Sequence, residues 1–230
     1  MSQTETARGV LRRGLQLLAG GALLALAMFV PAGTLGWWQA WAVLAIFFGA
    51  IAFNAVVILR GDPELIAERG ETREDTKGWD RVVMATITLS TLLILVVGGL
   101  DLRFGWSNVP LALSIAGLIL ILAGYAVVSW SMSANRFFAR VVRIQTDRGH
   151  TVCSSGPYRF VRHPGYAGLI VSSLAMSVGL GSWWALIPAV FTAGALVVRT
   201  VLEDRTLYLE LPGYSGYMAE VRYRLLRRVW

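Results

Sequence analysis

The sequence predicts an all-α fold: a polytopic membrane helix bundle of about five to six transmembrane helices. Of 230 residues, 56% are hydrophobic and 15% are charged, a balance that is too apolar for a soluble domain. Apolar runs of about the length needed to cross a bilayer also follow one another along the chain. They lie near Leu15–Val30, Trp37–Leu59, Val82–Leu100, Val109–Met132, Tyr166–Leu180 and Trp183–Leu202.

The first four runs are expected to be structural. The first two are joined by the short, uncharged connection Pro31–Gly36. Between the second and third lies Arg60–Arg81, whose mixed charges predict a solvated loop with internal ion pairs and no chemistry. We therefore assign residues 1–134 to four N-terminal transmembrane helices.

The last two runs are expected to form a tight helical hairpin, because only Gly181 and Ser182 separate them. The first arm, Tyr166–Leu180, is short for a full crossing. Polar motifs gather on both sides of this hairpin. Residues 135–230 are therefore assigned to a cofactor-binding and catalytic region with the hairpin and a cytoplasmic tail.

The distribution of basic residues predicts the topology. Every lysine and arginine except Arg103 lies before the first run, in the second-to-third or fourth-to-fifth connection, or from the end of the last run onward. The positive-inside rule then places both termini and these connections in the cytoplasm. We expect an integral protein of a bacterial-type inner membrane, with its active site facing the cytoplasm. Basic loops and anionic membrane lipids explain the net charge of +7, so no nucleic-acid partner is expected.

The chain offers little material for a metal site. Cys153 is the single cysteine, which excludes an intrachain disulfide, and there is no cluster of histidine and cysteine. No metal is therefore expected. Cys153 is interpreted as a small packing residue in preference to a nucleophile.

The segment Gly156–Gly168 carries the most informative motif. Pro157 and Pro164 keep the residues between them out of regular helix, and Pro164 suits the first position of the fifth helix. An exposed helix N-terminus beside Arg162 and His163 would attract an anionic group. The alternative is that the arginines only follow the topology rule and His163 caps a loop.

A second polar cluster lies at the end of the last run. Arg199 and Glu203 are four residues apart and share a helix face, with Asp204 beside them. Glu203 could accept hydrogen bonds from a ribose diol or an ammonium group, which leaves Arg199 for an anionic substrate. The alternative is a plain salt bridge between Arg199 and Glu203.

The C-terminal tail is expected to be an amphipathic helix on the membrane surface, broken at Gly213. Tyr214 and Tyr217 could cover a flat, purine-like ring, or could simply be residues of the aromatic belt at the interface. Because a hairpin brings its ends together, we expect His150–Tyr166 to face Arg199–Tyr217 at the cytoplasmic surface.

These residues resemble the isoprenylcysteine carboxyl methyltransferase family and the related phospholipid N-methyltransferases. That family's pattern is a histidine, a Gly-Pro-Tyr turn, Arg-His-Pro-x-Tyr-x-Gly, a hydrophobic hairpin, and Arg-x-x-x-Glu-Glu-x-x-Leu with downstream tyrosines. The chain matches it with His150, Gly156-Pro157-Tyr158, Arg162–Gly168, Arg199, Glu203-Asp204, Leu207, Tyr214 and Tyr217. Asp204 departs from the pattern, since the family usually has a second glutamate there.

The resemblance implies an integral-membrane enzyme that uses S-adenosylmethionine as its cofactor. It implies that the cofactor-binding residues are His150, Gly156, Tyr158, His163, Tyr166, Gly168, Glu203, Asp204, Tyr214 and Tyr217. The candidate catalytic residues are Arg199, Arg162 and Tyr166. The methyl acceptor would be a lipophilic or small molecule. Arg199 favours a carboxylate, while a thiol or a lipid amine stays open.

Two other functions are compatible with the pattern. A sterol-reductase-like, NADPH-dependent membrane reductase has a similar Arg-His-Pro-x-Tyr turn, but its family tends to have tryptophan and asparagine where this chain has Pro157 and Gly165. A non-enzymatic membrane protein, such as a small transporter, would use the polar clusters only to anchor loops. The sequence lacks the mid-span charges that a solute pathway needs.

Overall fold

The computed structural model describes residues 3–61, 77–139 and 141–230, and within these ranges every regular element is helical. This confirms the predicted all-α class. The long helices are α1 (Gln3–Ala32), α2 (Trp38–Gly61), α4 (Gly78–Phe104), α5 (Leu111–Ala134), α6 (Pro164–Gly179) and α7 (Leu186–Glu210). The short elements are η1 (Thr146–Arg148), η2 (Gly156–Arg159) and α8 (Tyr214–Glu220).

Four of the long helices are long and apolar enough to cross a membrane, namely α2, α4, α5 and α7. Two shorter apolar helices accompany them, the Gln16–Ala32 part of α1 and the whole of α6. The predicted polytopic helix bundle is therefore confirmed. At 16 residues, α6 is about 24 Å long, which is less than the roughly 30 Å hydrocarbon core of a bilayer.

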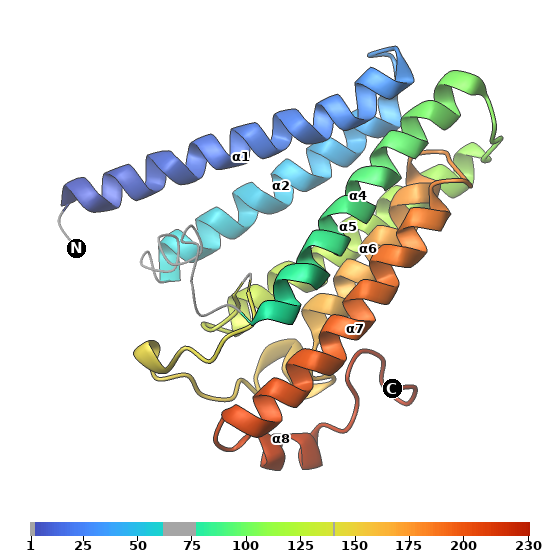
Figure 1. Ribbon diagram of the computed structural model, residues 1–230. Helices are drawn as coiled ribbons and strands as arrows, with labels where there is room; N and C mark the ends of the chain where they lie inside the picture. Colours follow the sequence, from blue (N-terminus) through green and yellow to red (C-terminus); the bar gives the residue numbers. More distant parts are fainter. Residues whose placement is uncertain (1–2, 62–76, 140) are drawn as a thin grey trace.

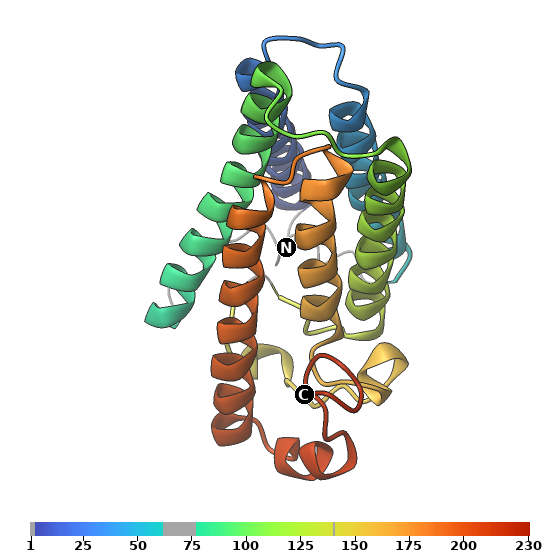
Figure 2. The same cartoon turned by 90° about the vertical axis from the view of Figure 1, so that its right-hand side faces the viewer.

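The long helices alternate in direction, so the bundle has two distinct ends. The α1–α2, α4–α5 and α6–α7 turns lie together at one end, at the top of Figure 2, which we call the turn end. At the opposite end, α5 finishes, α6 begins, α7 finishes, and α8 with the tail folds beneath them (Figure 2). We call this the site end.

Glycines allow α5 and α6 to pack with their backbones in contact. A Cβ atom on Gly117 would lie 2.5 Å from the backbone nitrogen of Gly179. A Cβ atom on Gly124 would lie 2.5 Å from the carbonyl oxygen of Gly168. Small residues are needed wherever membrane helices approach so closely. This contact fixes α6 against α5 along its length.

A buried carboxylate joins the connections at the turn end. Asp101, on α4, is 1% exposed and accepts hydrogen bonds from the backbone N–H of Ser107 at 2.7 Å and from its hydroxyl at 2.6 Å. The hydroxyl of Ser182, between α6 and α7, donates to the same carboxylate. The α4–α5 and α6–α7 connections are thereby tied to each other.

The tail follows the predicted interruption but packs inward. Helix α7 ends at Glu210. Gly213, with a φ of 84°, interrupts the helical path before α8 begins. Tyr214 and Tyr217 of α8 are buried and pack with Tyr158, so neither is a surface belt residue.

The charged loop Asp62–Asp75 lies outside the described residues. The assignment of residues 1–134 and 135–230 to separate regions stays a prediction.

The α5–α6 contact predicts that Gly117→Ala lowers the thermal unfolding temperature of the protein in detergent. The added methyl group would overlap the backbone of α6, and overpacking of this kind costs about 1–3 kcal/mol. Gly194→Ala is the matched control, because nothing lies within 4 Å of a Cβ atom at that position of α7. Equal unfolding temperatures for the two variants would contradict the close packing.

Candidate functional site

A cavity of about 350 Å³ lies at the site end of the bundle. Its wall contains most of the predicted site residues: His150, Tyr158, Arg162, His163, Tyr166, Arg199, Glu203, Tyr214 and Tyr217. Apolar side chains complete it, including Met84 of α4, Met132 of α5 and Leu169 of α6. The structure thus brings the two polar clusters together around one cavity, although the role of each residue stays a prediction.

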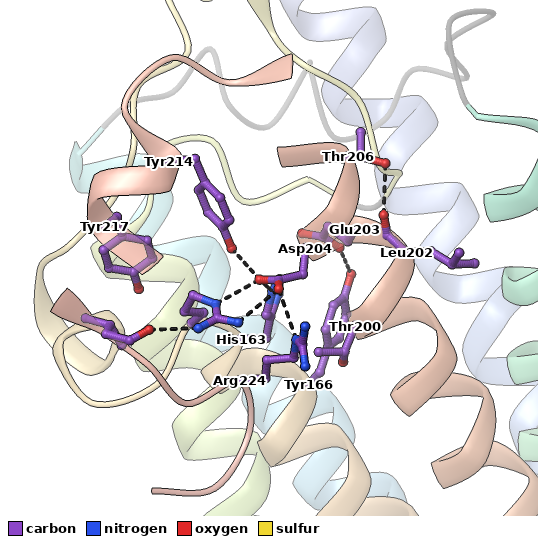
Figure 3. Close-up of polar contacts among 12 residues, drawn as sticks. His163, Tyr166, Thr200, Leu202, Glu203, Asp204, Thr206, Tyr214, Tyr217 and Arg224 are labelled. Atoms are coloured by element: carbon purple, nitrogen blue, oxygen red, sulfur yellow. Dashed lines mark hydrogen bonds and ion pairs between the residues drawn. The ribbon is translucent and has the colours of Figure 1, made fainter. Parts of the chain in front are cut away.

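Three of the predicted residues do not line the cavity. Gly156 has a φ of 56°, and a Cβ atom there would lie 2.8 Å from that of Ala134, so this glycine permits a tight turn. Gly168 lies in the α5–α6 contact. The carboxylate of Asp204 points into a buried polar network beside the cavity (Figure 3).

Asp204 is the centre of that network. Its Oδ1 atom accepts from Nε of Arg162 at 2.8 Å and from the hydroxyl of Tyr214 at 2.8 Å, and it lies 3.1 Å from Nε2 of His163. Its Oδ2 atom accepts from the terminal nitrogen of Arg162 at 2.9 Å and from Nε of Arg224 at 3.0 Å. One carboxylate therefore joins α7 to the start of α6, to α8 and to the tail (Figure 3).

Arg162 is committed to this network. Besides its two bonds to Asp204, it donates from Nη1 to the carbonyl oxygens of Val221 and Arg222, both at 2.8 Å. Burial lowers the pKa of Arg162 and the bonds to Asp204 raise it, with a net rise, so the guanidinium stays charged. These contacts tie Arg162 to the tail, and because Arg162 also lines the cavity, its catalytic role stays a prediction.

The tail also covers the start of α6. The backbone N–H of Arg162 donates to the carbonyl of Tyr223, and that of His163 donates to the carbonyl of Arg224, both at 2.9 Å. Pro164 and Gly165 are buried. The helix N-terminus was expected to be exposed and to bind an anion. The tail covers the two residues just before the helix, whereas Gly165 in its first turn lines the cavity, so anion binding there stays a prediction.

Three buried tyrosines supply hydroxyl groups near the cavity. Burial raises the pKa of Tyr158, Tyr214 and Tyr217, so all three phenols are protonated at neutral pH. The hydroxyl of Tyr217 donates to the carbonyl of Tyr158 at 2.7 Å, which fixes α8 on η2. All three residues line the cavity.

His150 follows η1 in the chain and also lines the cavity. Its Nδ1 atom accepts the backbone N–H of Gln145 at 3.3 Å, and its ring lies 4.5 Å from that of Phe137. Burial lowers the pKa of His150, and the nearby charges of Arg143 and Arg148 lower it further. The ring is therefore neutral at pH 7, with its proton on Nε2.

The second predicted cluster forms a chain of contacts. The hydroxyl of Tyr166 donates to a carboxylate oxygen of Glu203, and the Tyr166 ring stacks on His163 with 5.8 Å between ring centres. The guanidinium carbon of Arg199 lies 5.3 Å from the centre of the Tyr166 ring. Cation, phenol and carboxylate thus meet at one wall of the cavity.

The carboxylate that pairs with Arg199 comes from a region to which the sequence assigned no chemistry. Asp80, in the first turn of α4, is 0% exposed and accepts from Nε of Arg199 at 2.8 Å. The interpretation of Arg60–Arg81 as a solvated loop is therefore wrong at Asp80. An acid placed just before an apolar run was the available signal, since it lies at the same membrane boundary as Arg199.

Cys153 lines the cavity but has a structural contact. Its thiol donates to the carbonyl of Ala134 at 3.4 Å. Among the described residues, no three histidine, cysteine, aspartate or glutamate side chains gather as a metal site would require. Arg224, which contacts Asp204, was not singled out from the sequence, because nothing local marks it among the arginines of the tail.

Comparison with known proteins finds a family match over part of the chain, which includes many of the residues that line the cavity. Residues 115–209 match the isoprenylcysteine carboxyl methyltransferase (ICMT) family. The match confirms the resemblance inferred from the motifs, and it runs from α5 through α7.

Curated plant proteins are similar to part of this chain. A probable protein-S-isoprenylcysteine O-methyltransferase of Oryza sativa subsp. indica is 32% identical over 68 residues, which is 29% of this chain and 36% of that protein. Protein-S-isoprenylcysteine O-methyltransferase A of Arabidopsis thaliana is 30% identical over 95 residues, 41% of this chain and 46% of that protein. The similarity spans less than half the length of these relatives.

The Asp204 network predicts that Asp204→Asn strongly destabilises the fold. The change leaves Arg162 and Arg224 without their shared anion, and breaking a buried ion pair costs about 3–5 kcal/mol. Thermal unfolding in detergent measures the effect. Glu220→Gln, which neutralises an exposed acid on α8, is the control and should unfold as wild type does. Similar unfolding of both variants would show that the network contributes little.

The environment of His150 predicts a loss of stability in mild acid. A histidine whose pKa is lowered on folding stabilises the fold fully above its unfolded value of about 6.5, and this contribution is lost as the pH falls below that value. The unfolding temperature of wild type should therefore fall more steeply between pH 7 and pH 5 than that of His150→Gln. Parallel pH profiles would contradict a lowered pKa.

Proposed function

We propose, on the basis of this relationship to the ICMT family, that the chain is an integral-membrane methyltransferase. It would transfer a methyl group from S-adenosylmethionine to a lipophilic or small acceptor. The observation that carries the proposal is the cavity itself, whose wall unites the family-matched residues of α6 and α7 with tyrosines of α8.

The residues of the cavity fit the chemistry of this cofactor. Glu203 offers carboxylate oxygens for an ammonium group or a ribose diol, and the Nε2–H of neutral His150 can donate to an acceptor atom. Tyrosine rings offer flat apolar faces for a purine. The volume of about 350 Å³ lies within the range of small-molecule sites, which begins near 300 Å³.

The bound cofactor would supply an electrophilic methyl group on a sulfonium. The protein's part is to hold an acceptor in line with that group and to exclude water. The acceptor would supply the lone pair for the new bond to the methyl carbon, and the cofactor would keep the electron pair of the old bond on its sulfur. A thiol or amine acceptor also releases a proton, for which Glu203 is the nearby carboxylate.

The acceptor is proposed to approach from the lipid. Met84, Met132 and Leu169 line the cavity from α4, α5 and α6, which are apolar helices of the bundle. An apolar chain could therefore lie among helices while its polar head meets the cluster of Arg199, Tyr166 and Glu203. Because Arg199 is cationic, a carboxylate is the favoured head group, with thiols and lipid amines as the other candidates.

The location follows from topology. Apart from Arg103 in the last turn of α4, the basic residues of the described helices and connections lie away from the turn end, so the positive-inside rule supports a cavity that faces the cytoplasm. We propose a bacterial-type inner membrane as the site of action, with membrane lipids as neighbours. The soluble cofactor would then reach the cavity from the cytoplasm.

The proposal predicts that the purified protein in nanodiscs binds S-adenosylmethionine or its demethylated product, S-adenosylhomocysteine, in calorimetric titration, and does not bind NADPH. Glu203→Gln should weaken binding roughly ten- to a hundredfold, because a charged hydrogen bond contributes about 1.5–3 kcal/mol. Glu220→Gln is the matched acid-to-amide control and should bind as wild type does.

Binding of NADPH alone would assign the chain to the reductase class instead. Binding of none of the three ligands would favour a non-enzymatic membrane protein. An unchanged affinity in Glu203→Gln would remove Glu203 from the proposed contact with the cofactor.

A further inference from the structure

Asp80 stands behind the wall of the cavity and directly contacts two residues that form it. Both of its carboxylate oxygens accept from Arg199, Oδ1 from Nε at 2.8 Å and Oδ2 from a terminal nitrogen at 3.2 Å. Its Oδ2 atom also accepts the backbone N–H of Val142 at 2.9 Å. Arg199 and Val142 line the cavity, whereas Asp80 does not.

The two-point contact fixes both the position and the orientation of the guanidinium. A planar guanidinium held at two nitrogens cannot rotate about the axis of its side chain. Arg199 is thereby held beside the Tyr166 ring, whose hydroxyl donates to Glu203. The place of Arg199 in the proposed acceptor site is therefore set from α4, which packs against α7 and carries none of the motif residues.

Asp80 also changes the charge that an acceptor meets. Arg199 and Asp80 are 6% and 0% exposed at their side chains, so water screens their interaction little. A cation with a carboxylate at hydrogen-bond distance attracts an incoming anion less than a lone cation does. The ion pair therefore reduces the preference of the site for an acceptor with a full negative charge.

We propose that Asp80 is a positioning residue of the proposed methyltransferase site that also determines acceptor specificity, by orienting Arg199 and offsetting its charge. This inference rests on the proposed function. A purely structural role for Asp80 would be to join α4 to α7. Those helices have a second polar contact away from the cavity, in which the hydroxyl of Thr192 donates to that of Ser90 at 2.8 Å.

The experiment compares two acceptors that share one tail, dodecanoate and dodecanethiol. Methyl transfer to each is measured as kcat/KM with radiolabelled S-adenosylmethionine, and the affinity for S-adenosylhomocysteine is measured by calorimetry. The variants are Asp80→Asn, which removes the negative charge, and Asp80→Glu, which keeps the charge on a side chain that is one methylene group longer. Thr192→Val is the structural control, since it removes the other α4–α7 hydrogen bond.

Asp80→Asn should raise the ratio of kcat/KM for dodecanoate over dodecanethiol about tenfold relative to wild type, equivalent to about 1.4 kcal/mol. Its affinity for S-adenosylhomocysteine should stay within about twofold, because Asp80 does not line the cavity. Asp80→Glu should keep the wild-type ratio but turn over both acceptors more slowly, since the guanidinium is displaced. Should Asp80→Asn not fold, a changed ratio in Asp80→Glu would by itself overturn the role of the charge.

The inference is overturned if Asp80→Asn keeps the wild-type ratio, as Thr192→Val should. Failure of wild type to bind S-adenosylhomocysteine would instead contradict the proposed function. The same comparison can then be made from the thermal shifts that dodecanoate and dodecanethiol produce, which require no turnover. A larger shift with dodecanoate in Asp80→Asn than in wild type supports the role of Asp80, and equal shifts refute it.

Discussion

The site end of this protein depends on the buried carboxylate of Asp204. A charge at that depth costs several kcal/mol to remove from water, and only converging donors offset that cost. The donors come from the start of α6, from α8 and from the tail, so each segment is held in place by an anion that belongs to α7. Without that anion, Arg162 would be a buried cation that has lost its ion pair and keeps its bonds to the carbonyls of Val221 and Arg222. The cavity exists because these segments close around one side of it.

The apolar runs predicted the helices well, because the length and hydrophobicity of a membrane-spanning helix are local properties set by the thickness of the bilayer. The motif residues also gather as expected, because a tight hairpin must return the chain to the end where it began. What could not be predicted is the direction of each polar side chain. Arg162 turns to Asp204 and the tail, and Arg199 turns to Asp80 on a helix far back in the sequence. Such choices are decided by tertiary packing, which residue spacing does not encode.

The same limit explains why the start of α6 is more covered than the sequence predicted. Proline at the first position and two nearby cations correctly marked where the helix begins. They could not show that the tail would lie against it and use the backbone N–H of His163. The polar groups of a motif therefore indicate a functional region more reliably than they indicate which atoms meet the ligand.

The cluster around Asp101 has a mechanical consequence for how the cavity could admit a bulky molecule. Its hydrogen bonds hold the α4–α5 and α6–α7 connections together. A tilt of α7 would therefore pivot at the turn end. With 25 residues, α7 is about 37 Å long, so a 3 Å opening at its far end needs a tilt of only about 5°. Such a tilt would leave the contacts of the clamped end in place and would act on the site end, where Asp204 and Arg199 hold α7 to its neighbours.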